Sequence, residues 1–249
     1  MPETVYWMAP IGWYHLVIFS ALVPAMAWMS RRRSLRADAP KPPLGQFLRS
    51  TAGMLAIFSV LSALTAWQQD LNIWRLSLRR PLISIPLALG LYALAVVVMR
   101  PRWRRAVEKR LPHLRYFMPQ TPDERRWWFI VSVSAGISEE ITWRGVQPPL
   151  LAYVTGSPLA GMGLSAVMFG AAHAMQGLKS AAVIVLFAMA FQLLVWTSGS
   201  LWLAMIVHAA YDVTAGFTYS RLGRELGYEP DGVRPGSDQG QTGVRPGSD

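Results

Sequence analysis

Six ionisable residues set within apolar stretches are the part of this sequence best suited to do chemistry. Two carboxylates, Glu139 and Glu140, stand side by side, and Arg144 follows four residues after the second. A charged side chain costs about 2.5–3.5 kcal/mol to place at the centre of a membrane helix, so the residues that remain there are candidates for function. The complete set is Glu139, Glu140, Arg144, His173, His208 and Asp212.

Helical spacing predicts how these residues pair. Residues four apart share a helix face, so Glu140 and Arg144 are expected to form an ion pair. Glu139 points about 100° away from Glu140 and has no partner at this spacing, which leaves it available as a general base or acid. His208 and Asp212 also share a face, so Asp212 could orient the imidazole.

The same residues could also have purely structural roles. The charged pair could lock helices together, although one Glu with one Arg would suffice for that, and a lone His in an apolar helix often only packs. Taken together, the residues fit water activation by Glu and His, or metal coordination by His and carboxylate. The sequence contains no His-Glu-x-x-His and no Gly-x-Ser-x-Gly, so the zincin and hydrolase-elbow arrangements are absent. Ser138 is a weaker candidate nucleophile.

Long apolar runs must position these residues. Of the 249 residues, 52% are hydrophobic and only 15% are charged, against about 25% charged in an average soluble domain. A helix needs about 20 apolar residues to cross a bilayer. The sequence therefore predicts an all-α polytopic transmembrane helical bundle of seven or eight spans, with seven candidates at 10–29, 47–67, 81–99, 127–151, 158–176, 180–197 and 200–219.

Basic residues predict the orientation of this bundle. Grouping alternate loops gives 19 Lys and Arg on one side and three on the other, and the basic side is expected to be cytoplasmic. The N-terminus is then outside and the C-terminus cytoplasmic, and the net charge of +10 reflects topology rather than nucleic-acid binding. In the loop 100–126, apolar residues recur at helical spacing. This pattern suits an interfacial helix, although we favour a charged loop that fixes topology; the residues are Trp103, Val107, Leu111 and Leu114.

The chain divides into three predicted regions. Residues 1–126 form N-terminal spans with basic loops, 127–220 form the catalytic core, and 221–249 form an unstructured polar tail. The tail contains Gly-Val-Arg-Pro-Gly-Ser-Asp twice.

The absence of Cys excludes a disulfide framework and a thiol nucleophile. The high ratio of Arg to Lys suggests a bacterial protein of the inner (plasma) membrane.

The polar residues resemble those of a known family. Glu-Glu-x-x-x-Arg, Phe-x-x-x-His and His-x-x-x-Asn/Asp on successive helices look like the motifs of the CAAX protease and bacteriocin-processing (CPBP, or Abi) intramembrane proteases. The resemblance covers about 127–215, and implies an endopeptidase in which Glu139 activates water with help from His173. It further implies that Glu140 and Arg144 are a supporting pair, that Phe169 supports the site, and that His208 polarises the scissile carbonyl.

The resemblance leaves the cofactor and the substrate open. The last motif position is often Asn in this family, whereas it is Asp212 here, and an ionised carboxylate cannot donate to an oxyanion. A metal-free mechanism is favoured; with a zinc ion instead, the ligands would be Glu139, His173, His208 and Asp212. The expected substrate is a membrane-associated protein or peptide cut during maturation or C-terminal processing, as in myxosortase-like enzymes. A proton-coupled transporter and a non-catalytic membrane scaffold are the alternative functions.

Overall fold

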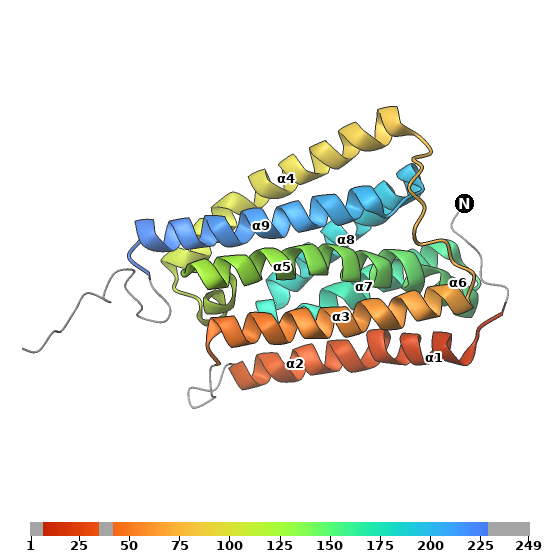
Figure 1. Cartoon of the computed structure of the whole chain (residues 1–249), viewed down its shortest axis with the longest axis horizontal. Coiled ribbons are helices and arrows are strands. Elements are labelled where there is room, and N and C mark those ends of the chain that lie inside the picture. Colours follow the sequence, from red (N-terminus) through yellow and green to blue (C-terminus); the bar gives the residue numbers. More distant parts are fainter. Residues whose placement is uncertain (1–6, 35–41, 229–249) are drawn as a thin grey trace, which may run out of the picture.

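A computed structural model describes residues 7–34 and 42–228, and every regular element in these ranges is helical (Figure 1). Two segments, η1 and η3, are π-helical, and two, η2 and η4, are 3₁₀ turns. The order is α1 (Pro10–Val17), η1 (Ile18–Leu22), α2 (Val23–Ser34), α3 (Leu44–Gln68), α4 (Pro81–Glu108), η2 (Pro112–Phe117), α5 (Pro122–Glu140), η3 (Ile141–Val146), α6 (Gln147–Thr155), α7 (Pro158–Ala172), η4 (Ala174–Gln176), α8 (Leu178–Ser198) and α9 (Trp202–Glu225).

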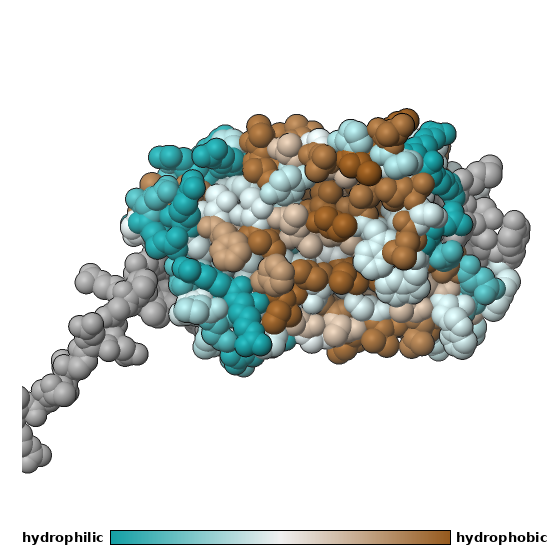
Figure 2. Space-filling view, turned by 45° about the horizontal axis from the view of Figure 1, so that its top comes forward, coloured by the Kyte–Doolittle hydropathy of each residue, from teal (hydrophilic) through white to brown (hydrophobic). Residues whose placement is uncertain are grey.

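The protein is an integral membrane protein with an all-α fold, as predicted. By length and composition, four helices in the described residues could cross a bilayer: Pro10–Arg33, α3, α4 and α8. The predicted spans 127–151 and 200–219 correspond to α5 to α6 and to α9, which carry the polar cluster and are therefore less apolar. The total of seven spans stays a prediction. On the face that Figure 2 shows, apolar residues cover the middle of the bundle and hydrophilic residues lie at both ends.

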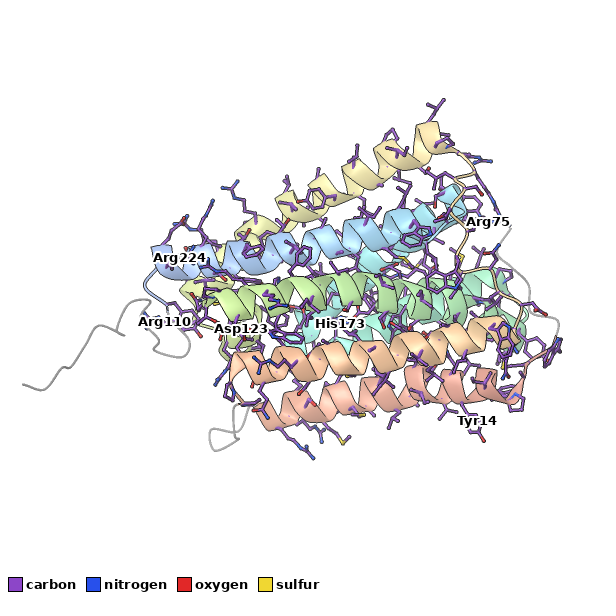
Figure 3. The ribbon with its side chains drawn as sticks, viewed as in Figure 1. Tyr14, Arg75, Arg110, Asp123, His173 and Arg224 are labelled. Atoms are coloured by element: carbon purple, nitrogen blue, oxygen red, sulfur yellow. The ribbon has the colours of Figure 1, made fainter. Side chains whose placement is uncertain are left out.

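The two ends of the bundle carry different residues. Figure 3 places Arg110, Asp123 and Arg224 at one end and Tyr14 and Arg75 at the other. This arrangement agrees with the predicted grouping of alternate loops, because Arg110 and Arg224 belong to the strongly basic set. Which end faces the cytoplasm stays a prediction.

Two predictions for the end that carries Arg110 were wrong. The helix that contains the span 81–99 continues as α4 to Glu108, and its apolar stripe turns inward rather than toward a membrane surface or solvent. Trp103 and Val107 are buried with Leu114, and the Trp103 ring lies 5.8 Å from that of Tyr211 on α9. α9 also continues to Glu225, so the start of the predicted unstructured tail 221–249 is helical. Residues 229–249 lie outside the described residues.

Candidate active site

Helix α5 brings the two adjacent glutamates to the middle of the bundle. It begins with a capping box in which the Thr121 side chain accepts from the Glu124 backbone and the Glu124 carboxylate accepts from the Thr121 backbone. Near its other end, Gly136 lies so close to α9 that an added Cβ would be 2.7 Å from the Met205 carbonyl oxygen. This close approach of the two backbones lets the carboxylates of Glu139 and Glu140 reach His208 on α9.

The backbone changes from α-helix to π-helix directly after Glu140. A proline shortly after this π-helical segment changes its hydrogen bonding. The Gln147 N–H bonds the Thr142 carbonyl, five residues back. Pro148 has no N–H, so the next carbonyl, that of Trp143, loses its main-chain donor. The helix continues through Pro148 and Pro149 into α6, and the Trp143 carbonyl is left to be satisfied from outside.

Two neighbouring helices supply the missing donors to the Trp143 carbonyl. Ser165 Oγ on α7 donates to it at 2.7 Å and Gln192 Nε2 on α8 donates at 3.0 Å. Both side chains are buried. Gln192 thus forms a hydrogen bond between α8 and η3. π-Segments often occur at functional sites, and this one shifts the register between Glu139–Glu140 and the residues that follow.

Glu140 is the buried anchor of the cluster. Its carboxylate Oε1 lies 3.1 Å from Arg144 Nη1, which confirms the ion pair predicted from the spacing. The same oxygen lies 2.7 Å from His208 Nδ1, and the side chain of Glu140 has no solvent exposure. The imidazole of His208 is thus held by Glu140, a residue 68 positions away, rather than by Asp212 one turn along its own helix.

Aromatic rings enclose the guanidinium of Arg144. Its Cζ lies 4.3 Å from the ring centroid of Phe169 and 5.4 Å from that of Phe191. Stacking against aromatic rings stabilises a buried Arg. The motif residue Phe169 therefore supports the site by contacting Arg144. Phe191 was missed by sequence reasoning, since nothing distinguishes it from the other apolar residues of its span. The Phe191 ring also lies 5.9 Å from that of His208.

Glu139 sits between two imidazoles without a hydrogen bond to either. Its Oε2 lies 3.8 Å from His173 Nε2 and 3.7 Å from His208 Nε2, and has no hydrogen-bond partner in the described part of the chain. His173 is the residue at which α7 ends, and its Nδ1 donates to the Phe169 carbonyl at 2.8 Å. Both histidines therefore use Nδ1 for orientation and present Nε2 to Glu139. Figure 3 shows His173 near the middle of the bundle.

Asp212 and Ser138 are placed differently from the rest of the cluster. Asp212 Oδ2 lies 3.6 Å from His208 Nε2, beyond hydrogen-bonding distance, and 30% of its side chain is exposed. Ser138 is buried, and its hydroxyl donates to the Leu55 carbonyl at 2.9 Å. This bond to α3 occupies the proton of Ser138, so Ser138 does not take part in the cluster.

Across residues 7–34 and 42–228, no three His, Asp or Glu side chains are grouped so that they could hold one metal ion. What the geometry offers instead is a carboxylate flanked by two oriented imidazoles and a second carboxylate neutralised by Arg. Such a set can remove a proton from a bound molecule and stabilise the negative charge that develops on it.

Comparisons with known proteins agree with this chemistry. Residues 122–214 match the family model described as Rce1-like, type II CAAX prenyl endopeptidase. The matched segment contains every residue of the cluster, from Glu139 to Asp212. No curated protein and no solved structure shows a significant match to the chain.

Proposed function

We propose that this protein, whose residues 122–214 match the Rce1-like family model, is an intramembrane endopeptidase that hydrolyses a peptide bond with water activated by Glu139. One observation carries the proposal. Of the two adjacent glutamates, Glu139 is the one whose Oε2 has no hydrogen-bond partner among the described residues, and this oxygen lies within 3.8 Å of two histidine Nε2 atoms. Glu140, by contrast, is engaged by Arg144 and His208.

The separations suit a shared water molecule. Polar atoms more than 3.5 Å apart often act through a bridging water, and one water can contact Glu139 Oε2 and both Nε2 atoms. Glu139 removes a proton from this water while the water oxygen attacks the scissile carbonyl carbon. The proton then passes to the leaving nitrogen as the C–N bond breaks. His173, tied through Nδ1 to the Phe169 carbonyl, keeps Nε2 directed at the water.

His208 is the proposed stabiliser of the oxyanion. Its Nδ1 is fixed by Glu140, so a protonated Nε2 can donate to the negatively charged oxygen of the tetrahedral intermediate. Asp212 lies 3.6 Å from that Nε2 and serves as a charge partner of the imidazolium, not as a donor. Arg144 acts through Glu140 and is a positioning residue.

The proposed substrate is a membrane-associated protein or peptide. The cluster lies within the membrane-spanning bundle, so a substrate must present an extended segment at the depth of His173 (Figure 3). We propose a maturation or C-terminal processing role in a bacterial inner membrane, with the strongly basic end of the bundle in the cytoplasm.

The test compares protein C-termini in cells that carry the wild-type chain, Glu139→Gln or Asp123→Asn. Asp123 lies on the same helix, and its side chain is 55% exposed and paired with Arg49, so it is the matched control. We expect a set of membrane or secreted proteins to lose their processed C-terminus only in Glu139→Gln. With a purified substrate, cleavage should fall about 10²–10⁴-fold, the usual contribution of a general base.

Three outcomes would contradict the proposal. Cleavage of a genuine substrate that survives in both Glu139→Gln and His173→Ala would remove these residues from the mechanism. Cleavage that is lost on treatment with a chelator and restored by zinc would replace the metal-free mechanism with a metal-dependent one. Proton flux in liposomes that depends on Glu139, without any cleavage, would favour a transporter.

A further inference from the structure

The connection between α3 and α4 holds three arginines at the less basic end of the bundle. Arg75, Arg79 and Arg80 are the three basic residues that the loop count assigns to this end, and Figure 3 shows Arg75 there. Within the described residues, no carboxylate forms an ion pair with any of them. Basic residues that gather where they are otherwise scarce, without acidic partners, call for a local reason.

This connection is fixed against the turn between α8 and α9. The Arg79 backbone N–H donates to the Ser198 carbonyl at 2.7 Å, and Ser200 Oγ donates to the Arg75 carbonyl at 2.6 Å. Gly199 lies so close to the Arg79 side chain that an added Cβ would be 2.7 Å from its Cδ. The backbone at two of the three arginines is therefore fixed on a rigid support, while Arg79 itself is exposed; a fixed backbone is a property of preformed binding sites.

The two held arginines line a pocket that reaches the catalytic cluster. Its volume is about 110 Å³, enough for a phosphate or carboxylate group and too small for a folded segment. Its lining includes Arg75 and Arg79 from the α3–α4 connection, Arg144 from η3 and Gln192 from α8. No Asp or Glu of the described residues lines the pocket. Arg75 and Arg79, which have no ion-pair partner among the described residues, together with Arg144, which is also paired with Glu140, make it a site for an anion.

Arg144 gives independent evidence for a ligand. Its side chain is only 2% exposed, and neither its Nε nor its Nη1 forms a hydrogen bond in the described part of the chain, although Nη1 lies in the ion pair with Glu140. A buried donor without an acceptor is costly, unless an acceptor can enter. Arg144 lines the pocket, so an anionic oxygen bound there could accept from its guanidinium, which Glu140 contacts at Nη1.

The surroundings of the pocket indicate a membrane lipid as the source of this anion. Trp196 lines the pocket and is 54% exposed, and Trp74 and Leu76, which flank Arg75, are 52% and 72% exposed. Exposed Trp beside Arg is typical of the headgroup level of a bilayer. Basic pockets between membrane helices bind lipid headgroups. We propose that this pocket binds the phosphate of an anionic phospholipid, whose acyl chains lie along the adjacent apolar surface.

This lipid site does not depend on the proposed protease activity. A bound phosphate would share Arg144 with Glu140, so lipid occupancy and the geometry of the catalytic cluster are expected to be coupled. Binding itself can be measured without any substrate.

The experiment measures phosphatidylglycerol binding to the purified, delipidated protein by native mass spectrometry. The variants are Arg75→Gln/Arg79→Gln, and Arg80→Gln as the matched control, because Arg80 lies on the same connection but does not line the pocket. We expect the double variant to bind about tenfold more weakly or worse, since two charge-assisted contacts are lost. Arg80→Gln should stay within about twofold of wild type. Equal binding by the double variant and wild type would overturn the proposal.

A second measurement uses the unaltered chain and so does not rely on the variants folding. Phenylglyoxal modifies accessible arginines, and peptide mass spectrometry reports each one. We expect phosphatidylglycerol to protect Arg75 and Arg79 but not Arg80, and phosphatidylcholine to protect them less. Protection by inorganic phosphate alone, equal to that by the lipid, would overturn the assignment to a lipid. Identical modification with and without lipid would overturn the site.

Discussion

Two π-helical segments lie against each other in this bundle, and they differ in what surrounds them. η1 belongs to the first membrane helix, and η3 follows the two glutamates. The rings of Phe19 and Trp143 meet edge to face at 5.6 Å, and Gln147 Nε2 donates to Ser20 Oγ at 2.9 Å. Each segment also lies next to a buried histidine system. The backbone conformation of η1 and η3 is thus similar, whereas the groups that surround the nearby histidines differ.

Among the described residues, the side-chain hydrogen-bond partner of the histidine near η1 is a hydroxyl. His15 is completely buried, and its Nε2 lies 3.2 Å from Ser62 Oγ, which lies 2.8 Å from Thr142 Oγ1. His173 and His208 instead face carboxylates, and 22% and 13% of their side chains are exposed. A polar residue in a membrane helix becomes a candidate for catalysis when opposite charges and access to water coincide. Without them, it is a packing contact between helices.

The largest effect should come from removing the cation beside η3. Arg144→Met leaves Glu140 buried without its guanidinium, and breaking a buried ion pair costs about 3–5 kcal/mol. We expect the free energy of unfolding in detergent to fall by this amount. Cleavage should also be lost, because Glu140 is no longer held by Arg144 and so no longer fixes the imidazole of His208. Arg49→Met is the control, since the Arg49–Asp123 pair is more than half exposed and should be worth at most about 1 kcal/mol. Equal losses for both would show that burial of the Arg144 pair has no energetic consequence.

A smaller effect is expected from the donors to η3. The double variant Ser165→Ala/Gln192→Leu leaves the Trp143 carbonyl without a side-chain donor, which costs about 1–3 kcal/mol. Cleavage should fall in parallel, because the π-segment positions Glu139 and Glu140. Thr51→Ala is the control, as Thr51 Oγ1 donates to the Phe47 carbonyl within one helix turn. A double variant as stable and active as wild type would mean that the Trp143 carbonyl needs no side-chain donor.

The smallest effect should come from the histidine near η1. His15→Leu replaces a buried imidazole that has no carboxylate partner, and Ser62 keeps its contact with Thr142. We expect a change in unfolding free energy within about 1.5 kcal/mol and cleavage within about twofold of wild type. His173→Leu, measured alongside, should abolish cleavage. If a folded His15→Leu variant also lost cleavage, the distinction between the two regions would fail.

The sequence was most informative where the interaction is local. Apolar runs of about 20 residues predicted α3, α4 and α8 because a bilayer imposes that length. The Glu140–Arg144 pair followed from four-residue spacing, which needs no knowledge of the fold. Order and spacing of the Glu, Phe and His motifs identified the family segment. The inward packing of Trp103 was not predictable, because an amphipathic stripe does not reveal whether it faces lipid or another helix.

Contacts between distant segments were decided by the tertiary structure alone. The sequence determined that Glu139, Glu140, His173, His208 and Asp212 sit in apolar helices, but not which carboxylate holds which imidazole. Because α5 approaches α9 closely at Gly136, the imidazole of His208 bonds Glu140 rather than Asp212. The stacking of Phe191 on Arg144 and the bonds to the Trp143 carbonyl arise in the same way. Helix periodicity fixes neighbours within one helix, whereas partners on different helices depend on packing that no single span encodes.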